Sequence, residues 1–317
     1  MSIVGIVAWT LIVVMAVIVV TQLAGWSGSS AVVTLQAATP YVLALSVPIG
    51  IAAAIAGWLP LAVVAAAMAV VLVVMAQPLR RSSDELAHHD AAQVIRVFHG
   101  NLLCYNGRTA ELARVVARLD ADVLAFTEYT PTHAGGLYVS PLGAGYPYRI
   151  EHPESTAGGS AMWSRHPLTE VSSPPALYQS TAARVDLAGG VTVFVVHPPN
   201  PLENIRPWRD EIQGLARSAT GNATPSIVVG DFNATYWHPP FRELLAAGWR
   251  DAHVVAGRGF SSSWPNHWPL VPPFLRLDHA LVDAALTVTD AVDIDLPGSD
   301  HRGFVVSMMV NPAETAG

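Results

Sequence analysis

The chain has 317 residues, of which 51% are hydrophobic and only 13% are charged, and its formal net charge is -7. The segment from Met1 to Gln77 contains no Asp, Glu, Lys or Arg, and the first charged residue is Arg80. This uneven distribution excludes a wholly disordered or a wholly water-soluble chain. The roughly 240 residues after it are enough for one large domain or two small ones.

Three apolar runs in the charge-free segment each approach the roughly 20 residues with which a helix crosses the hydrocarbon core of a bilayer. The runs are 3–23, 35–56 and 59–76, and Trp26 and Trp58 lie in the turns between them, where an interfacial position suits the indole. We predict three transmembrane helices within 1–79, which place the termini on opposite sides of the membrane. A cleaved signal peptide fits poorly, since no basic region leads the first run and two further runs follow.

Residues 80–92 are polar and are predicted to form a linker to a domain over 93–312. In this domain short β-branched runs alternate with amphipathic stretches, which indicates a mixed α/β fold of stacked sheets. A loop rich in Pro and Trp is expected over 261–273. We expect strands at 94–103, 123–128, 160–164, 183–187, 191–197, 226–230, 277–282, 287–294 and 303–310, and helices at 109–119, 207–219 and 240–247.

Polar side chains stand at the ends of several predicted strands. The buried run 226–230 leads directly into Asp231 and then Asn233, which alternation places on the same side of the strand end. Each such residue has a structural alternative, such as a capping carboxylate or a hydrogen-bonded core histidine. Together they indicate a site that binds a hard cation and moves protons. The other strand ends carry Asn101, Glu128, His197, Asp278, Asp300 and His301.

The order of these residues resembles the endonuclease/exonuclease/phosphatase superfamily, whose fold is that of deoxyribonuclease I. The resemblance extends over roughly residues 94–310. It implies a four-layered α/β/β/α sandwich, here preceded by three transmembrane helices, and a metal-dependent hydrolase that acts on phosphoester bonds. The motifs are Asn101, Glu128, His197, Gly-Asp231-Phe-Asn233, Leu-Asp278-His and Ser-Asp300-His301.

The resemblance also implies a metal site. Glu128, with Asn101 nearby and Asp300 on the same side, would bind Mg²⁺, or Mn²⁺ or Ca²⁺ in its place, since these hard cations prefer oxygen ligands. Some members of the superfamily carry an additional acid two residues after the first Asn, where this chain has Leu103. This departure argues against a second metal ion.

Five further residues are expected to take part in catalysis by the same resemblance. His301 would be the general base or would contact the transition state, and Asp278 would hold its imidazole in one tautomer. His197 would face the phosphate and could protonate the leaving oxygen. Asp231 and Asn233 would position the attacking water and a phosphate oxygen, or would bind a second ion.

Three residues that follow His197 are candidates for substrate binding. Asn200, Arg206 and Arg209 could reach an anionic substrate, although the two arginines could equally cover a helix face. The chain contains no Lys and is acidic, whereas a nuclease of duplex DNA usually offers a basic footprint. Nucleic acid is therefore the less expected partner.

The predicted loop before Asp278 is expected to lie beside the site. Its residues Trp264, Trp268 and Phe274 would contact a bilayer or a lipid substrate if they are exposed, or would pack on one another. A membrane anchor on a short linker would also raise the effective concentration of a lipid-borne substrate.

The layout of three spans followed by this domain resembles the VanJ-like actinobacterial proteins associated with teicoplanin resistance. That resemblance implies a multi-pass protein of the cell membrane with an extracytoplasmic site that acts on envelope lipids such as undecaprenyl pyrophosphate. Arg80 and Arg81 favour a cytoplasmic domain by the positive-inside rule, but two arginines are a small bias. We therefore expect the domain on the extracytoplasmic side.

Three functions remain open from the sequence. The first is a membrane-anchored phosphoesterase that uses a divalent metal and water to hydrolyse a phosphate, pyrophosphate or phosphodiester bond of a lipid-linked or envelope substrate. The second is a surface-anchored nuclease that cleaves DNA or RNA. The third is a catalytically silent membrane scaffold, against which the complete set of polar residues argues. The bond that is cut and the oligomeric state are open.

Overall fold

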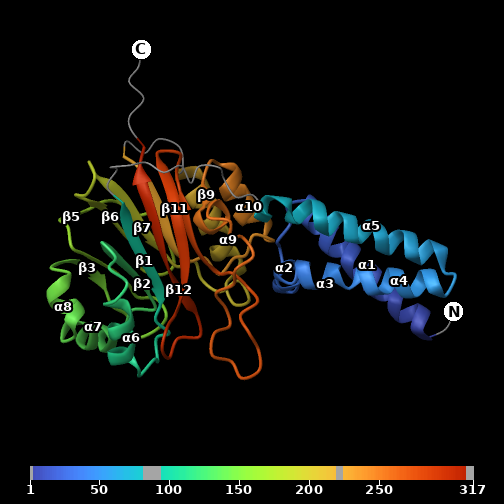
Figure 1. Cartoon of the computed structure of the whole chain (residues 1–317), viewed down its shortest axis with the longest axis horizontal. Helices are drawn as coiled ribbons and strands as arrows, with labels where there is room; N and C mark the ends of the chain where they lie inside the picture. Colours follow the sequence, from blue (N-terminus) through green and yellow to red (C-terminus); the bar gives the residue numbers. More distant parts are fainter. Residues whose placement is uncertain (1–2, 81–93, 219–223, 312–317) are drawn as a thin grey trace, which may run out of the picture.

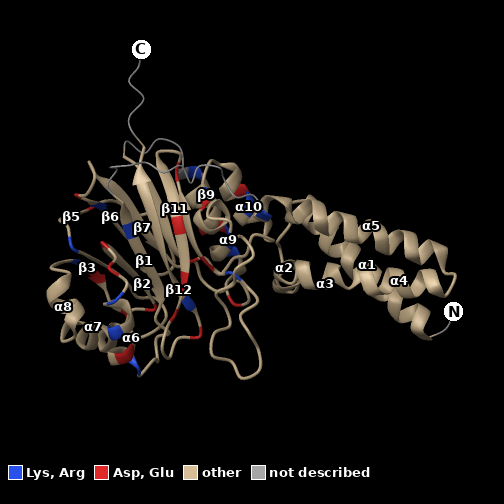
Figure 2. Cartoon of the chain, in the orientation of Figure 1, with Lys and Arg blue, Asp and Glu red and all other residues tan. Residues whose placement is uncertain are grey.

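The computed structural model describes residues 3–80, 94–218 and 224–311. The apolar helices extend to one side of a strand-rich part, with the N-terminus at the far end (Figure 1). The charged residues of the described ranges lie in the strand-rich part or at its border with the helices (Figure 2). The two compositions seen along the sequence are therefore separate in space.

The apolar part consists of five helices within the described residues. They are α1 (Ile3–Leu23), α2 (Ser30–Ala37), α3 (Thr39–Ala44), α4 (Ser46–Ile55) and α5 (Leu59–Ala76), which a short 3-10 helix, η1 (Gln77–Arg80), extends. Two helices in the described ranges, Ile3–Leu23 and Leu59–Arg80, are long and apolar enough to cross a membrane. The number of candidate spans is three if α2 and the segment Thr39–Ile55 form one bent span.

The middle run, expected as one helix over 35–56, is instead bent by 60° between α2 and α3. Pro40 lies in the first turn of α3, and in a continuous helix it would have no N–H to donate to the carbonyl of Gln36 and its ring would clash with that carbonyl. Helix α2 also begins earlier than expected, at Ser30, because the Ser29 hydroxyl caps it by accepting the N–H of Val32. The bend sets α2 apart from the rest of the span and beside the strand-rich part (Figure 1).

The strand-rich part contains two six-stranded sheets among the described residues. The first has the order β11-β12-β1-β2-β4-β3, and the second has the order β5-β6-β7-β8-β10-β9. The strands are β1 (Ile95–Asn101), β2 (Val123–Thr127), β3 (Tyr148–His152), β4 (Ser160–Ser164), β5 (Leu168–Glu170), β6 (Thr181–Val185), β7 (Val191–Val196), β8 (Ser226–Asp231), β9 (Arg250–Asp251), β10 (Asp278–Val282), β11 (Leu286–Asp295) and β12 (Arg302–Val310). The helices are α6 (Thr109–Val116), α7 (Pro131–Tyr138), α8 (Pro141–Gly145), α9 (Ile205–Ser218), α10 (Pro239–Ala246) and α11 (Ala252–Val255).

Successive side chains of the central strands point to opposite faces of their sheet, and this alternation produces the layers of the sandwich. Val97 of β1 and Val229 of β8 belong to the core between the two sheets. Phe98, the next residue of β1, packs in the core under α6, α7 and α8, whereas Val228 of β8 packs with α9 and α10. Successive residues of one strand thus pack in two different hydrophobic cores, one on each face of the sheet. The four-layered α/β/β/α sandwich expected from the sequence is confirmed.

Each predicted strand and helix of the domain is present, and the described ranges also contain six elements that were not predicted. Strands β5 and β9 are very short, and β3 is a half-exposed edge strand without alternation. Thr130 and Pro131 are typical of the start of a helix, as at α7, but Gly135 and Gly136 have low helix propensity, so the sequence did not predict this helix. The predicted linker 80–92 lies, except for Arg80, outside the described residues, so the domain boundaries remain a prediction.

The sheet topology brings the predicted strand ends to one edge of the sandwich. Strands β1 and β2 are parallel, as are β7 and β8, so their carboxyl ends meet in pairs. Strands β10 and β12 run antiparallel to β8 and β1 and therefore begin where those strands end. Asp278 at the start of β10 is paired directly with Asp231 at the end of β8.

Candidate active site

A cavity of about 550 Å³ opens at this edge of the sandwich. Seven of the residues predicted from the sequence line it, namely Glu128, His197, Asn200, Asp231, Asn233, Asp300 and His301, and its other polar lining residues include Tyr178, Glu203 and His238. Two other predicted residues, Asn101 and Asp278, are completely buried behind this lining, where they hydrogen-bond with residues that face the cavity. Side chains separated by up to 200 positions in the sequence thus gather around one cavity, as expected.

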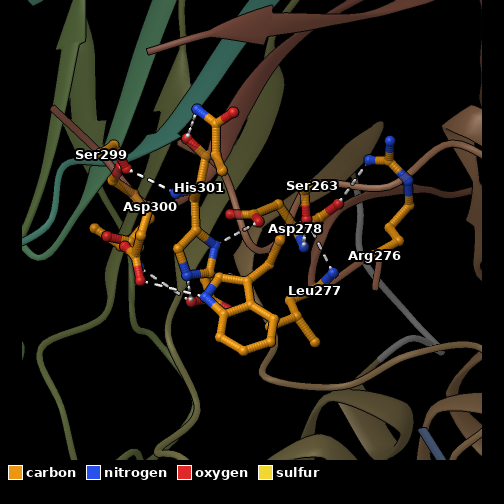
Figure 3. Close-up of polar contacts among 12 residues, drawn as sticks. Ser263, Arg276, Leu277, Asp278, Ser299, Asp300 and His301 are labelled. Atoms are coloured by element: carbon orange, nitrogen blue, oxygen red, sulfur yellow. Dashed lines mark hydrogen bonds and ion pairs between the residues drawn. The ribbon is translucent and has the colours of Figure 1, made fainter. Parts of the chain in front are cut away.

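His301 is held by Asp278. Its Nδ1 lies 2.8 Å from Oδ2 of Asp278, and the imidazole points toward this carboxylate in Figure 3. Asp278 is itself fixed by Ser263, whose hydroxyl accepts the N–H groups of Leu277 and Asp278 at 3.0 and 3.2 Å. The Ser299 hydroxyl accepts the N–H of His301 at 3.0 Å, which fixes the backbone as well. The imidazole is therefore held in one orientation.

The charges of this pair favour an imidazolium. Burial alone would lower the pKa of His301, but Asp278 and Asp231 outweigh it and raise this pKa to about 10. Burial raises the pKa of Asp278, whereas His301 lowers it to about 2. A protonated Nε2 can donate a hydrogen bond to a phosphate oxygen but cannot accept a proton. Of the two roles expected for His301, the charges favour contact with the transition state.

Asp231 lies at the centre of the polar groups. Its Oδ2 is 3.0 Å from Nδ2 of Asn101, 3.6 Å from Nε2 of His197 and 3.7 Å from Nε2 of His301. Its Oδ1 accepts the N–H of Asn233 at 2.8 Å. Burial raises the pKa of Asp231, although the nearby His301 opposes this effect. A carboxylate of raised pKa that faces the cavity is placed to take a proton from water.

His197 is oriented by a backbone carbonyl. Its Nδ1 lies 3.2 Å from the carbonyl oxygen of Ala157, which can only accept, so Nδ1 carries the proton. The Tyr178 ring lies 5.2 Å from the imidazole, centroid to centroid. Nε2 is left facing Asp231 and the cavity, where it can exchange a proton with a substrate oxygen.

Glu128 and Asp300, the carboxylates expected from the sequence to bind a divalent cation, both line the cavity. Oε1 of Glu128 accepts from Asn101 at 3.0 Å and Oε2 from the N–H of Cys104 at 2.8 Å. Glu128 has a φ of 52°, in the left-handed region that non-glycine residues rarely adopt and that recurs at functional sites. Oδ1 of Asp300 is buried with no hydrogen-bond partner in the described part of the chain, and a hard cation satisfies such an oxygen.

Asn101 presents its amide nitrogen, rather than its oxygen, to the carboxylates of Glu128 and Asp231, since its Oδ1 accepts the N–H of Leu103 at 2.9 Å. In this orientation it separates the two acids. One group of three side chains in the described ranges, Asp231, Asp278 and His301, is also close enough to hold a metal ion. The direct bond between Asp278 and His301 favours an ion pair there over a metal site.

The model of the Endonuclease/Exonuclease/phosphatase family matches residues 95–301. The chain belongs to this family. The match runs from the first residue of β1 to His301, so it includes every predicted catalytic and metal-binding residue. Members of the family generally hydrolyse phosphoester bonds. No curated protein matches the chain in sequence.

Solved structures agree with the family in fold. An endonuclease/exonuclease/phosphatase from Beutenbergia cavernae is 17% identical with a TM-score of 0.54, and the match covers 71% of this chain and 73% of that one. TDP2 from D. rerio, humanized by 14 mutations, is 14% identical with a TM-score of 0.56, covering 68% and 98%. The beta toxin of Staphylococcus aureus is 15% identical with a TM-score of 0.50, covering 67% and 99%.

Two of the three predicted substrate-binding residues do not line the cavity. Arg206 and Arg209 are at the start of α9 and do not line it, and Arg209 instead lies 3.5 Å from the carboxylate of Asp210. This placement agrees with the alternative that the arginines cover a helix face. Asn200 does line the cavity, although its Oδ1 accepts the N–H of Leu202 at 2.9 Å.

The Trp-rich loop lies beside the site, as expected. The indole of Trp264 donates to Oδ2 of Asp300 at 3.2 Å, and its ring contacts those of Trp268 and Phe274. Of the two alternatives for this loop, exposure to a bilayer fits Trp268 and Leu270, which are exposed, whereas packing of the aromatic side chains on one another fits Trp264. The bond from Trp264 to Asp300 was not predicted, since a Trp in a loop carries no signal of its partner.

Proposed function

We propose that the chain is a membrane-anchored phosphoesterase that hydrolyses a phosphate, pyrophosphate or phosphodiester bond of a lipid-linked or envelope substrate. The observation that carries this proposal is a single cavity in which two imidazoles, two candidate metal-binding carboxylates and a buried aspartate face one another. Membership of a family of phosphoester hydrolases supports the reaction. The apolar helices support the anchor.

The side chains divide the reaction between them. Asp231 takes a proton from the attacking water, because its carboxylate faces the cavity and burial raises its pKa. The His301 imidazolium, held by Asp278, stabilises negative charge on the phosphate oxygens. In its imidazolium form, His197 gives the Nε2 proton to the leaving oxygen and becomes neutral, and the protonated Asp231, whose Oδ2 lies 3.6 Å from Nε2, returns a proton to it. Asn233 lines the same cavity.

Glu128 and Asp300 would hold Mg²⁺, or Mn²⁺ or Ca²⁺. When bound, such an ion polarises a phosphoryl oxygen and offsets developing charge. The fit rests on the unpartnered oxygen of Asp300 and on the oxygen-rich donor set, which suits a hard cation.

The shape of the cavity favours a small phosphate group over a duplex. Its volume of about 550 Å³ lies in the range of sites for small molecules. The chain lacks Lys, and both arginines that could have formed a basic entrance lie outside the lining. A surface nuclease is therefore the weaker candidate, and a silent scaffold would not need the oriented histidines.

We place the catalytic domain on the extracytoplasmic side of the cell membrane. With three crossings, the N-terminus would lie on the cytoplasmic side. Protease treatment of intact cells should then digest the domain, whereas cleavage only after lysis would contradict this orientation.

The function is tested with the full chain in detergent. Phosphate or alcohol release from lipid pyrophosphates and lipid phosphodiesters, and strand cleavage of DNA and RNA, are measured in parallel, with Mg²⁺ or with EDTA. We expect Mg²⁺-dependent turnover of a lipid substrate that Asp231→Ala and His301→Ala abolish. Asp186→Asn, on an exposed aspartate outside the cavity, is the matched control. Turnover of nucleic acid alone would favour the nuclease, and no turnover would favour the scaffold.

A further inference from the structure

The apolar N-terminal part supplies one wall of the catalytic cavity. Val33, Thr34, Ala37 and Ala38 of the α2 region line it together with the polar residues of the sandwich. Their spacing places them on one face of the helix. No residue of this segment is charged, and the hydroxyl of Thr34 donates to the backbone carbonyl of Ser30 at 2.9 Å, so this wall of the cavity is largely apolar.

Helix α2 is anchored on the sandwich. His238 Nε2 lies 3.0 Å from the carbonyl oxygen of Val33, whose side chain packs in the core that contains Trp208 and Phe232. From α10, the Arg242 guanidinium donates to the side-chain oxygen of Gln22, at the end of α1, at 2.9 Å. These contacts hold the apolar helices against the sandwich, so α2 is a fixed wall of the cavity.

Gln22 also connects to the bend after α2 through hydrogen bonds. The Gln22 amide donates to the Thr39 hydroxyl at 2.5 Å, and this hydroxyl donates to the carbonyl of Gln36 at 2.6 Å. All three side chains are buried. Because buried polar groups without partners are costly, this chain of hydrogen bonds holds the bend in place.

The apolar wall continues from the cavity into the candidate span. Ala38, Tyr41 and Leu45 follow one another at helical spacings, and the side chains of Tyr41 and Leu45 are 47% and 45% exposed. At the rim, the Tyr41 hydroxyl donates to the carbonyl of Phe274, and the two rings meet edge to face at 5.9 Å. Exposed apolar side chains therefore follow Ala38, which lines the cavity, along the candidate span.

We propose that α2 and the segment Phe274–Leu275 form a subsite for the hydrocarbon chain next to the phosphate of a membrane lipid, which enters sideways along Ala38, Tyr41 and Leu45. This inference rests on the proposed function for the position of the phosphate. The polar wall receives the phosphate, and the apolar wall receives the first carbons of the chain. Burial of each CH₂ group contributes about 0.8 kcal/mol, so the subsite selects amphiphilic over water-soluble phosphates.

The selectivity is tested with matched substrate pairs. Hexadecyl and methyl pyrophosphate form one pair, and the hexadecyl and methyl esters of p-nitrophenyl phosphate form another. For the wild type we expect a kcat/KM at least about tenfold higher for the hexadecyl member, since burying two methylenes supplies that factor. Thr34→Trp, at an exposed position of the cavity wall, should reduce this ratio about tenfold. Ala54→Trp, on an exposed position of α4 outside the cavity, should keep it.

A binding measurement separates this inference from the proposed function. A hexadecyl phosphonate with a diazirine on its second carbon cannot be hydrolysed, and it should label α2 and Phe274–Leu275 in the detergent-solubilised wild type. Labelling there without turnover of any substrate would refute the proposed function alone. Labelling confined to the outer faces of α1 and α5, or an unchanged ratio in Thr34→Trp, would overturn the subsite.

Discussion

Nε2 of His238 and the carbonyl oxygen of Val33 lie 3.0 Å apart and join the sandwich to the apolar part of the chain. Nδ1 of His238 accepts the N–H of Thr235 at 2.9 Å, so Nε2 carries the proton that Val33 accepts. This geometry requires a neutral imidazole. Burial lowers the pKa of His238 to about 4.

The first prediction concerns the stability of the fold at acidic pH. Because the pKa of His238 is below the unfolded value of about 6.5, its contribution to stability is complete above that pH and is lost as the pH falls toward 4. The loss is up to about 3 kcal/mol by linkage. Thermal unfolding of wild type and His238→Gln should show a smaller decline between pH 6.5 and 4 in the variant. Equal declines would contradict this prediction, since His99, also with a pKa of about 4, is common to both proteins.

The second prediction concerns the support of His301. Asp278→Asn keeps the volume of the side chain but removes the charge that holds the imidazolium 2.8 Å away. We expect kcat to fall by about 10²- to 10⁴-fold with little change in KM, because orientation and charge matter most in the transition state. Steady-state kinetics with a turned-over lipid substrate measure this. A change confined to KM would show that Asp278 serves substrate binding instead.

The third prediction concerns the metal. Glu128→Gln and Asp300→Asn each remove one anionic ligand, and we expect the Mg²⁺ concentration for half-maximal activity to rise by about tenfold or more. Binding of Mn²⁺, followed by electron paramagnetic resonance, should weaken in parallel without any substrate. Asp186→Asn is the control, since this exposed carboxylate does not line the cavity. Unchanged Mn²⁺ affinity in both variants would place the ion elsewhere.

The fourth prediction concerns the junction between the two parts. Arg242→Met removes the hydrogen bonds from the guanidinium to the side chain and backbone carbonyl of Gln22, at 2.9 and 3.3 Å. We expect a loss of about 1.5–3 kcal/mol for bonds to a charged group, seen as a lower unfolding temperature. Protease cleavage between α1 and α2 should also become faster. Arg184→Met, at an exposed position of β6, is the control and should change neither the unfolding temperature nor the rate of this cleavage.

Much of the candidate site could be predicted because short motifs carry it. Asp231 and Asn233 follow a buried strand, and Glu128 and His197 each follow another, so a parallel arrangement brings them to one edge. The hydrogen-bonding partners were harder to predict. Trp264 reaches Asp300 from a loop with no periodicity, and the orientation of the Asn101 amide depends on the backbone of Leu103.

The division into an uncharged apolar part and a polar sandwich can be predicted from the sequence, because charge and hydrophobic periodicity are local properties of a chain. The order of the strand-end residues is likewise visible in the sequence. The 60° bend after α2 and the place of Val33 and Ala37 in the cavity lining emerge only in the folded molecule, as does the position of Arg206 and Arg209 outside that lining. These outcomes depend on packing between segments far apart in sequence, such as Val33 against the core around Trp208, for which no local pattern exists.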